Sequence, residues 1–141
     1  MAITDPIADA LTIIRNGVRA KKERVDLRAS KLMTEVLKVL KRERFIFDYR
    51  LIEDKKQGIL RVYLRKAEVL SQAPAMAPSN RLISRIDRIS KPGRRVYADK
   101  QNIPIVLNGL GVCVVSTPHG LMTGEEAKKR GVGGEVLLRI W

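Results

Sequence analysis

The feature that most constrains the fold is a break near the middle of the chain. Residues 66–80 read KAEVLSQAPAMAPSN, and alanine, proline and serine dominate the second half of this stretch. Neither the helical period of about 3.6 residues nor the strand period of 2 continues through it, which is typical of a linker. The sequence therefore predicts two small lobes, 1–65 and 81–141, joined by a linker at 66–80.

The first lobe has a pattern in which helices alternate with strands. Thr4 or Asp5 can cap a first helix, Pro6 suits its first turn, and an apolar stripe at helical spacing follows. Ser30 is a plausible N-cap of a second helix over 31–45. The buried face of that second helix is expected to contain Leu32, Val36, Val39 and Leu40. Strand-like runs occur at 24–28, 45–52 and 59–65. This order predicts an α/β layer in which helices cover one apolar sheet face.

The second lobe is predicted to be mainly β, with short helices at one edge. Thr123 and Glu126 have capping-box spacing, so a short helix is expected to begin there and to end at Gly131. Gly133 and Gly134 allow a tight turn into the last strand, or the close approach of another backbone. Strand-like runs occupy 81–90, 94–99, 112–116 and 135–141, and one or two helical turns are expected within 102–111. The whole chain is therefore predicted to be an α+β protein.

Charge is the strongest indication of function. The chain has 28 Lys and Arg against 15 Asp and Glu, a formal net charge of +13. Such a charge makes the chain repel itself, and proteins usually offset this by binding a polyanion, most often a nucleic acid. The alternative is a solvated cationic surface without a partner. A single cysteine, Cys113, excludes an internal disulfide and is expected to be a buried thiol. No segment approaches transmembrane length, and the N-terminus reads as the first folded element of a cytosolic protein.

The segment 116–134, STPHGLMTGEEAKKRGVGG, invites a catalytic interpretation that its spacing does not support. Ser116 lacks the Gly-x-Ser-x-Gly context of a nucleophile elbow, and no acid is placed to orient His119. A phosphate-binding loop of the Gly-x-x-x-x-Gly-Lys-Ser/Thr type is absent. Glu125 and Glu126 are adjacent on a helix and therefore point in different directions, which disfavours a metal pair. We expect no enzyme activity, no metal and no cofactor.

The same segment suits RNA recognition. The hydroxyls of Ser116 and Thr117 and the amides around Gly120 can all form hydrogen bonds from one rigid corner, as the sugars, phosphates and base edges of RNA require. Residues 81–100, with seven basic and two acidic side chains, would supply the electrostatic attraction. Tyr97 offers a ring for stacking on a base, but a core position for this tyrosine is equally compatible with the sequence.

Several blocks, in order along the chain, carry a family resemblance: DPIADALTIIRNG, RISKPGRRVY, IPIVLNGLGV, GLMTGEEAKKRGVGGE and the terminal IW. The chain resembles bacterial-type ribosomal protein S8 of the small subunit over nearly its whole length. The resemblance implies two small lobes, the second mostly antiparallel β. It also implies direct, early binding to the central domain of small-subunit ribosomal RNA, at the platform of the subunit. Ribosomal proteins S5 and S12 are the implied neighbours, and the cytoplasm, or an organelle, is the implied location.

The resemblance also implies which residues contact RNA: Ser30, Lys31, Lys91, Gly93, Arg94, Arg95, Tyr97, Ser116, Thr117, His119, Gly120 and Glu135. Two positions depart from the family pattern. Pro118 stands where the family loop has a second serine, and so removes a hydroxyl and a backbone N–H. His119 stands where a lysine is expected.

A second class of function remains open from the sequence. The chain could be a free DNA- or RNA-binding regulator outside the ribosome, and the resemblance itself includes repression of a messenger that encodes ribosomal proteins. The absence of a helix-turn-helix and of an aromatic RNP-type strand counts against a free regulator. Cell fractionation separates the two, because a ribosomal protein sediments with small subunits.

Overall fold

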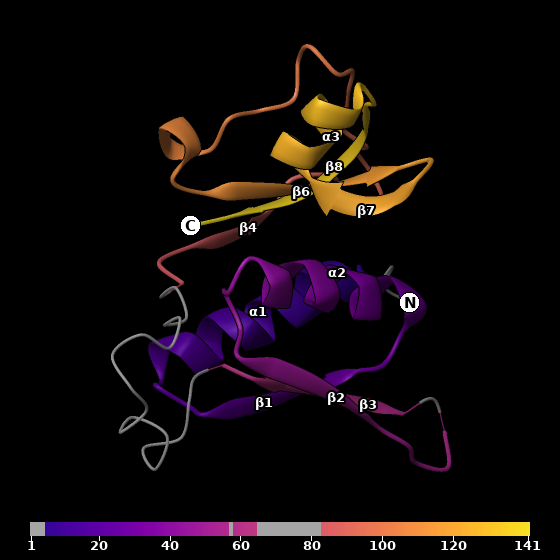
Figure 1. Cartoon of the computed structure of the whole chain (residues 1–141). Coiled ribbons are helices and arrows are strands. Elements are labelled where there is room, and N and C mark those ends of the chain that lie inside the picture. Colours follow the sequence, from indigo (N-terminus) through magenta and orange to yellow (C-terminus); the bar gives the residue numbers. More distant parts are fainter. Residues whose placement is uncertain (1–4, 57, 65–82) are drawn as a thin grey trace. The chain divides into compact units, whose positions relative to one another are not determined.

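The computed structural model describes residues 5–56, 58–64 and 83–141 (Figure 1). The chain divides into two compact units. One takes in Thr12–Leu82, and the other combines Met1–Leu11 with Ile83–Trp141. The predicted linker at 66–80 lies outside the described residues, so the predicted lobe boundaries stay a prediction. The α+β fold class is confirmed, since helices and antiparallel sheets are both present.

The Thr12–Leu82 unit is a three-stranded sheet with helices on one face (Figure 1). Its elements are α1 (Pro6–Arg19, which begins in the other unit), β1 (Arg24–Arg28), α2 (Lys31–Arg42), β2 (Asp48–Ile52) and β3 (Ile59–Tyr63). The strand order is β1-β3-β2, and both pairings are antiparallel. Leu60, Val62 and Leu64 are buried, as the alternation of the β3 sequence predicts. The predicted α/β layer is thus confirmed.

Helix α2 begins where predicted and ends early. The Ser30 hydroxyl accepts a hydrogen bond from the Met33 amide at 3.1 Å, which confirms the N-cap. Leu32 is 42% exposed, so its predicted burial is wrong. The buried arc begins one residue later, at Met33, and Leu32 lies outside it. Arg44 has φ of 67°, which ends the helix, and Phe45 then packs into the core before β2 begins.

The second unit is a mainly antiparallel sheet built around one long strand. Its elements are β4 (Ile86–Arg88), β5 (Tyr97–Ala98), the 3-10 turn η2 (Leu107–Gly109), β6 (Val112–Thr117), β7 (Gly120–Thr123), α3 (Gly124–Arg130) and β8 (Gly134–Ile140). β8 pairs with β4, β5 and β6, and β7 extends the sheet beyond β6. Strands β4 and β5 are shorter than predicted, and the β6–β7 hairpin was not predicted, because GLMT lacks a strand-like alternation.

Helix α3 packs on one face of this sheet. The Thr123 hydroxyl accepts from the Glu126 amide at 3.1 Å, and Gly131 ends the helix with φ of 69°, as predicted. The apolar cluster of this unit contains Ile103, Val106, Cys113, Val115, Met122, Ala127 and Val136. Burial raises the pKa of the Cys113 thiol, which confirms a structural rather than a reactive cysteine.

Two consecutive glycines let β8 enter the sheet. A Cβ on Gly134 would overlap the backbone carbonyl of Ser116 in β6, and a Cβ on Gly133 would overlap the carbonyl of Ala98 in β5. These obstacles are backbone atoms, which cannot move aside as a flexible side chain can. The predicted close approach of another backbone is therefore observed, on both sides of the chain.

Replacing Gly134 by alanine should destabilise the protein by about 3 kcal/mol, the upper range for overpacking against rigid neighbours. Urea unfolding would measure this loss. Gly93→Ala is the matched control, because no atom lies within 4 Å of a Cβ placed at Gly93. The control should change stability by less than about 0.5 kcal/mol. Equal stability of the two variants would contradict the close packing of the β8 backbone against the β6 backbone.

Candidate nucleic-acid interface

A row of side chains crosses the sheet near the start of β8. Glu135 of β8 is the register partner of Tyr97 in β5 and of Ser116 in β6. Residues directly opposite each other in antiparallel strands point to the same face of a sheet. Their neighbours Val115 and Val136 belong to the apolar cluster beneath α3. The row of Tyr97, Glu135 and Ser116 therefore lies on the sheet face opposite to that cluster.

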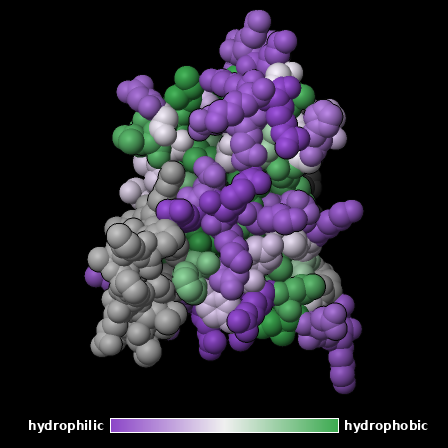
Figure 2. All heavy atoms as spheres, in the orientation of Figure 1, coloured by the Kyte–Doolittle hydropathy of each residue, from purple (hydrophilic) through white to green (hydrophobic). Residues whose placement is uncertain are grey.

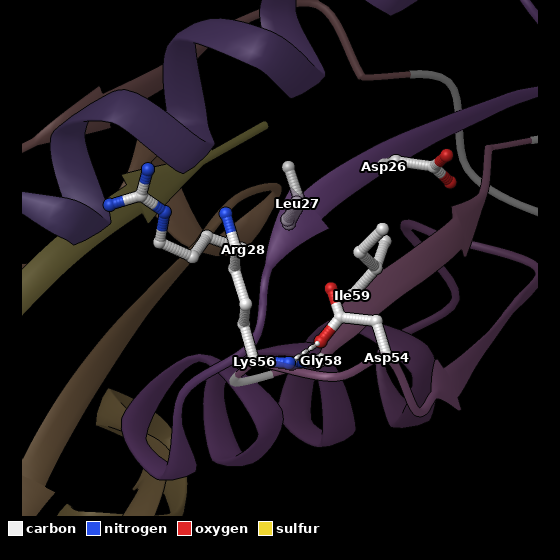
Figure 3. A pocket seen from close by; sticks show the side chains of 7 residues that line it. All are labelled: Asp26, Leu27, Arg28, Asp54, Lys56, Gly58 and Ile59. Carbon is white, nitrogen blue, oxygen red and sulfur yellow. Dashed lines mark hydrogen bonds between the residues drawn. The ribbon is translucent and has the colours of Figure 1, made fainter.

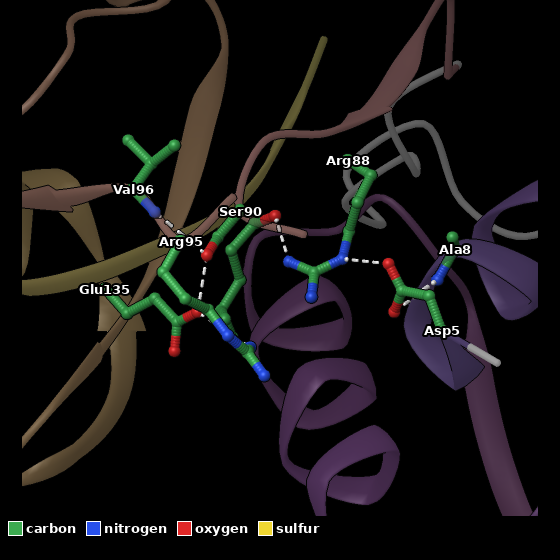
Figure 4. Close-up of polar contacts among 8 residues, drawn as sticks. Asp5, Ala8, Arg88, Ser90, Arg95, Val96 and Glu135 are labelled. Atoms are coloured by element: carbon green, nitrogen blue, oxygen red, sulfur yellow. Dashed lines mark hydrogen bonds and ion pairs between the residues drawn. The ribbon is translucent and has the colours of Figure 1, made fainter. Parts of the chain in front are cut away.

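Glu135 is the centre of a polar network within the protein (Figure 4). Its Oε2 accepts a short hydrogen bond from the Ser90 hydroxyl and an ion-paired hydrogen bond from Arg95 Nη1 at 3.0 Å. The Ser90 hydroxyl also accepts from the Val96 amide at 3.1 Å. Burial alone would raise the pKa of Glu135, but the donors Ser90 and Arg95 outweigh it and lower that pKa. The carboxylate thus holds the strand that carries Tyr97, and a direct RNA contact by Glu135 stays a prediction.

The basic turn before β5 is displayed to solvent. Lys91 and Arg94 form a backbone bridge, with N–H to O distances of 3.0 and 2.9 Å. Their side chains are exposed, as is Gly93 between them. Within the described part of the chain, neither Lys91 nor Arg94 has an ion-pair partner. Arg95 is different, because it is tied to Glu135. The turn therefore offers two cations without an ion-pair partner among the described residues, Lys91 and Arg94, and a third, Arg95, that Glu135 holds in position.

Tyr97 projects from β5 into solvent. Its side chain belongs to the exposed large apolar residues of the molecule, at 70% exposure. A core position, which the sequence left open, is therefore wrong. An exposed aromatic ring beside a basic turn is suited to stacking on a base.

The turn between β6 and β7 uses one hydroxyl and leaves another available. Thr117 Oγ1 donates to the Gly120 carbonyl at 2.8 Å and accepts from the His119 amide at 3.1 Å, and this side chain is buried. Gly120 has φ of 105°, a conformation that favours glycine. Among the described residues, the half-exposed Ser116 hydroxyl has no hydrogen-bond partner. Thr117 builds the turn, whereas Ser116, Pro118 and His119 face outward or lie at its rim.

Ser30 and Lys31 lie in the Thr12–Leu82 unit, at the N-terminus of α2. Both residues are exposed, and the Ser30 hydroxyl is engaged in capping the helix. The other predicted contact residues, from Lys91 to Glu135, all belong to the second unit. Ser30 and Lys31 are therefore a separate candidate RNA contact, in the Thr12–Leu82 unit.

Comparison with known proteins decides the family. A sequence model of the family described as ribosomal protein S8 matches residues 5–141. The chain belongs to the ribosomal protein S8 family. It is 50% identical, over the full length of both chains, to the small ribosomal subunit protein uS8 of Oceanobacillus iheyensis. It is 48% identical to the protein of the same name from Thermodesulfovibrio yellowstonii, over 99% of each chain. Membership of a family of ribosomal proteins confirms the expectation that the chain is not an enzyme.

Arg88 is a buried arginine of this S8-family chain that the sequence did not single out (Figure 4). Its side chain is only 7% exposed. The guanidinium donates to Asp5 Oδ2 at 3.1 Å and to the Leu137 carbonyl at 2.7 Å. Asp5 Oδ1 accepts in turn from the Ala8 amide, which confirms Asp5 as the cap of α1. Arg88 therefore joins the first turn of α1 to β4 and β8, and no local motif distinguishes it from the other arginines nearby.

A shallow pocket of about 400 Å³ lies in the Thr12–Leu82 unit, between the end of β1 and the β2–β3 turn (Figure 3). Its carboxylates are already engaged. Asp26 pairs with Arg61 at 3.0 Å, and Asp54 Oδ1 accepts from the amides of Lys56 and Gly58. A hydrogen bond from Arg61 lowers the pKa of Asp26 despite opposing desolvation. None of the predicted contact residues lines this pocket, and we assign no function to it.

Two further observations bear on the site. Within residues 5–56, 58–64 and 83–141, no three His, Cys, Asp or Glu side chains are grouped so as to hold a metal ion. None of the described helices combines the length and the apolar character that crossing a membrane would require.

Replacing Glu135 by glutamine should cost about 2 kcal/mol at pH 7, as expected for hydrogen bonds to a charged group. The folded-state pKa of Glu135 is lowered, so its stabilisation is present above the ordinary pKa of a glutamate and disappears as the pH falls through the folded value. Urea unfolding from pH 7 to pH 3 should show the gap between wild type and Glu135→Gln closing in acid.

Glu125→Gln is the control, because Glu125 is 82% exposed and its ion-pair partner is Lys129 of the next turn. It should change stability by less than about 0.5 kcal/mol at every pH. A gap for Glu135→Gln that stays constant with pH would show that the carboxylate charge does not hold this network.

Proposed function

We propose that this chain is a structural protein of the small ribosomal subunit that binds the central domain of the ribosomal RNA directly and helps to form the platform. The observation that carries the proposal is the convergence at the start of β8. Here β8 brings the exposed ring of Tyr97 and the basic turn that precedes it beside the Ser116 hydroxyl of β6, which has no hydrogen-bond partner among the described residues. The names of the relatives support the ribosomal assignment.

Each part of this surface suits a different feature of RNA. Lys91 and Arg94 are free to neutralise phosphates. The ring of Tyr97 can stack on an unpaired base. The Ser116 hydroxyl can donate to, or accept from, a 2′-OH or a base edge. Thr117 and Glu135 act mainly by holding these groups in place, through the hairpin turn and through Arg95.

The loop departs from the family pattern at Pro118 and His119, and both residues change how it can bind RNA. Pro118 has no amide to donate, and the His119 amide is already used by Thr117. The exposed ring of His119 is therefore the group that can replace the missing contact. Gly120 completes the turn and allows close approach of a sugar or a base, because no atom lies within 4 Å of its Cβ position.

The family resemblance extends the proposal to partners and location. Ribosomal proteins S5 and S12 would be the neighbours in the particle, and the cytoplasmic small subunit would be the location. Ser30 and Lys31 would add an RNA contact from the N-terminus of α2, where the exposed backbone end and a cation favour a phosphate.

The direct test is binding to a transcript of the central domain across a salt series, beside a scrambled RNA of equal length. Wild type should stay selective at physiological salt. Ser116→Ala should lose about fivefold in affinity for the target, near 1 kcal/mol for one hydrogen bond. It should leave binding to the scrambled RNA unchanged.

Ser84→Ala, at an exposed serine of the same unit, should bind like wild type. Equal binding of both RNAs, vanishing together as salt rises, would mean that the net charge alone explains the affinity. Sedimentation of the protein away from small subunits in cell extracts would instead favour a free regulator.

Stacking and phosphate contact can be separated by their salt dependence. Tyr97→Leu should weaken binding to the central-domain transcript by about 1 to 3 kcal/mol without changing the salt slope. Arg94→Gln should lower the slope of log K against log salt by roughly 0.7 to 0.9. Both residues are exposed, so urea unfolding should be nearly unchanged. A change of slope with Tyr97→Leu would contradict the stacking role.

A further inference from the structure

The loop between β5 and β6 exposes large apolar side chains. Ile105 is 67% exposed, Leu107 49% and Leu110 78%. In Figure 2, hydrophobic residues gather at the upper left, over the segment that carries η2 in Figure 1. We call residues 104–111 the apolar loop. Single exposed aliphatic side chains need no explanation, but three on one short loop are typical of a contact surface.

The apolar loop lies in a stretch of the chain that has no charge. Charged residues make up 30% of the sequence, yet none occurs between Lys100 and Glu125. A surface that binds RNA phosphates needs cations, and the apolar loop itself supplies none. Depletion of charge together with exposed aliphatic side chains is the composition found at the centre of protein–protein interfaces.

The backbone of the apolar loop is strained and nevertheless held in place. Leu107, Asn108 and Gly109 have φ of 46°, 55° and 94°, and Leu107 is of a residue type that seldom adopts positive φ. Val106 anchors the loop in the core of the unit, and its carbonyl accepts from the amides of Gly109 and Gly111 at 3.0 and 3.1 Å. A strained turn that displays leucines is pre-organised for a partner rather than for stability.

The rim of the apolar loop is cationic. Trp141 adjoins the loop, because a Cβ on Gly111 would lie 2.9 Å from the Cβ of Trp141. Arg85 and Arg139 stand over the Trp141 ring, 5.9 and 5.4 Å from its centroid. Both arginines share one carboxylate, Asp87, so the rim keeps a surplus of positive charge. A matching surface would be apolar at its centre and acidic at its edge.

We propose that the apolar loop is a docking site for another protein of the particle, one that presents an apolar surface rimmed by carboxylates. The proposal rests on the ribosomal function proposed above. The loop leads into β6 at Val112, and the turn proposed to face RNA leaves β6 at Thr117. A strand rises about 3.4 Å per residue, so the two ends lie roughly 17 Å apart. One strand therefore carries an RNA contact at one end and a protein contact at the other.

Two other occupants are disfavoured by charge. RNA would find no cation in the loop itself. A second copy of the chain would bring another net charge of +13 and the same arginine rim, so the two rims would repel each other. A protein with carboxylates at the edge of its contact surface satisfies both the apolar centre and the rim.

The test is site-specific photo-cross-linking in cells, with benzoylphenylalanine in place of Leu110. We expect an adduct with one other protein of the small subunit, identified by mass spectrometry. Adducts with RNA, with a second copy or with the chain itself, or the absence of any adduct, would overturn the proposal. The same group in place of Arg94 should give an RNA adduct, which reports on the proposed RNA surface separately.

The identified protein should then bind Leu110→Lys about tenfold more weakly than wild type, since a buried charge opposes an apolar contact. Leu51→Lys is the matched control, because Leu51 is also exposed, at 59%, and lies in the other unit. Central-domain transcript binding should be the same for all three proteins. Undiminished binding of the partner by Leu110→Lys would overturn the docking site, whereas failure of wild type to select the transcript would overturn the proposed RNA function alone.

Discussion

The entry of β8 between β5 and β6 is the constraint on which the candidate interface depends. The backbone carbonyls of Ala98 and Ser116 leave no space for a Cβ at Gly133 or Gly134. Only a chain without side chains at both positions can pass there and continue as a strand. The residue that follows, Glu135, is then paired on both sides at once. Tyr97 and Glu135, which are 38 positions apart in the sequence, are thereby fixed beside one another and beside Ser116.

This arrangement separates residues that build the surface from residues that face outward. Glu135 and Thr117 are polar residues of the family motifs, yet their hydrogen bonds are made within the protein: to Ser90 and Arg95 for Glu135, and to His119 and Gly120 for Thr117. Buried polar groups hold geometry well when every donor and acceptor is satisfied. The exposed Tyr97 and the half-exposed Ser116 hydroxyl gain fixed positions from this support.

Local signals in the sequence were sufficient to predict where the helices begin and where α3 ends. They were insufficient to predict how the strands pair in the sheet of the second unit. Caps at Ser30 and Thr123 and the stop at Gly131 depend on neighbouring residues, and all three were predicted. The order of the strands depends on long-range pairing. Nothing in the local pattern places β5 beside β8, or sets the bulge at which Val114 faces Leu138 while Val115 faces Val136. The burial of Arg88 against Asp5 likewise depends on a contact 83 positions apart in sequence.

The uneven distribution of charge along the chain affects how selectively the protein can bind RNA. A chain of net charge +13 that was basic on every surface would attract RNA in many orientations with similar strength. An exposed basic turn at Lys91–Arg94, together with an uncharged stretch from residue 101 to residue 124, limits the orientations that satisfy both surfaces. Electrostatic attraction then supplies the rate of association, while the hydroxyl, the ring and the apolar loop select the geometry. Specific binding by so basic a protein requires uncharged surface as much as it requires charge.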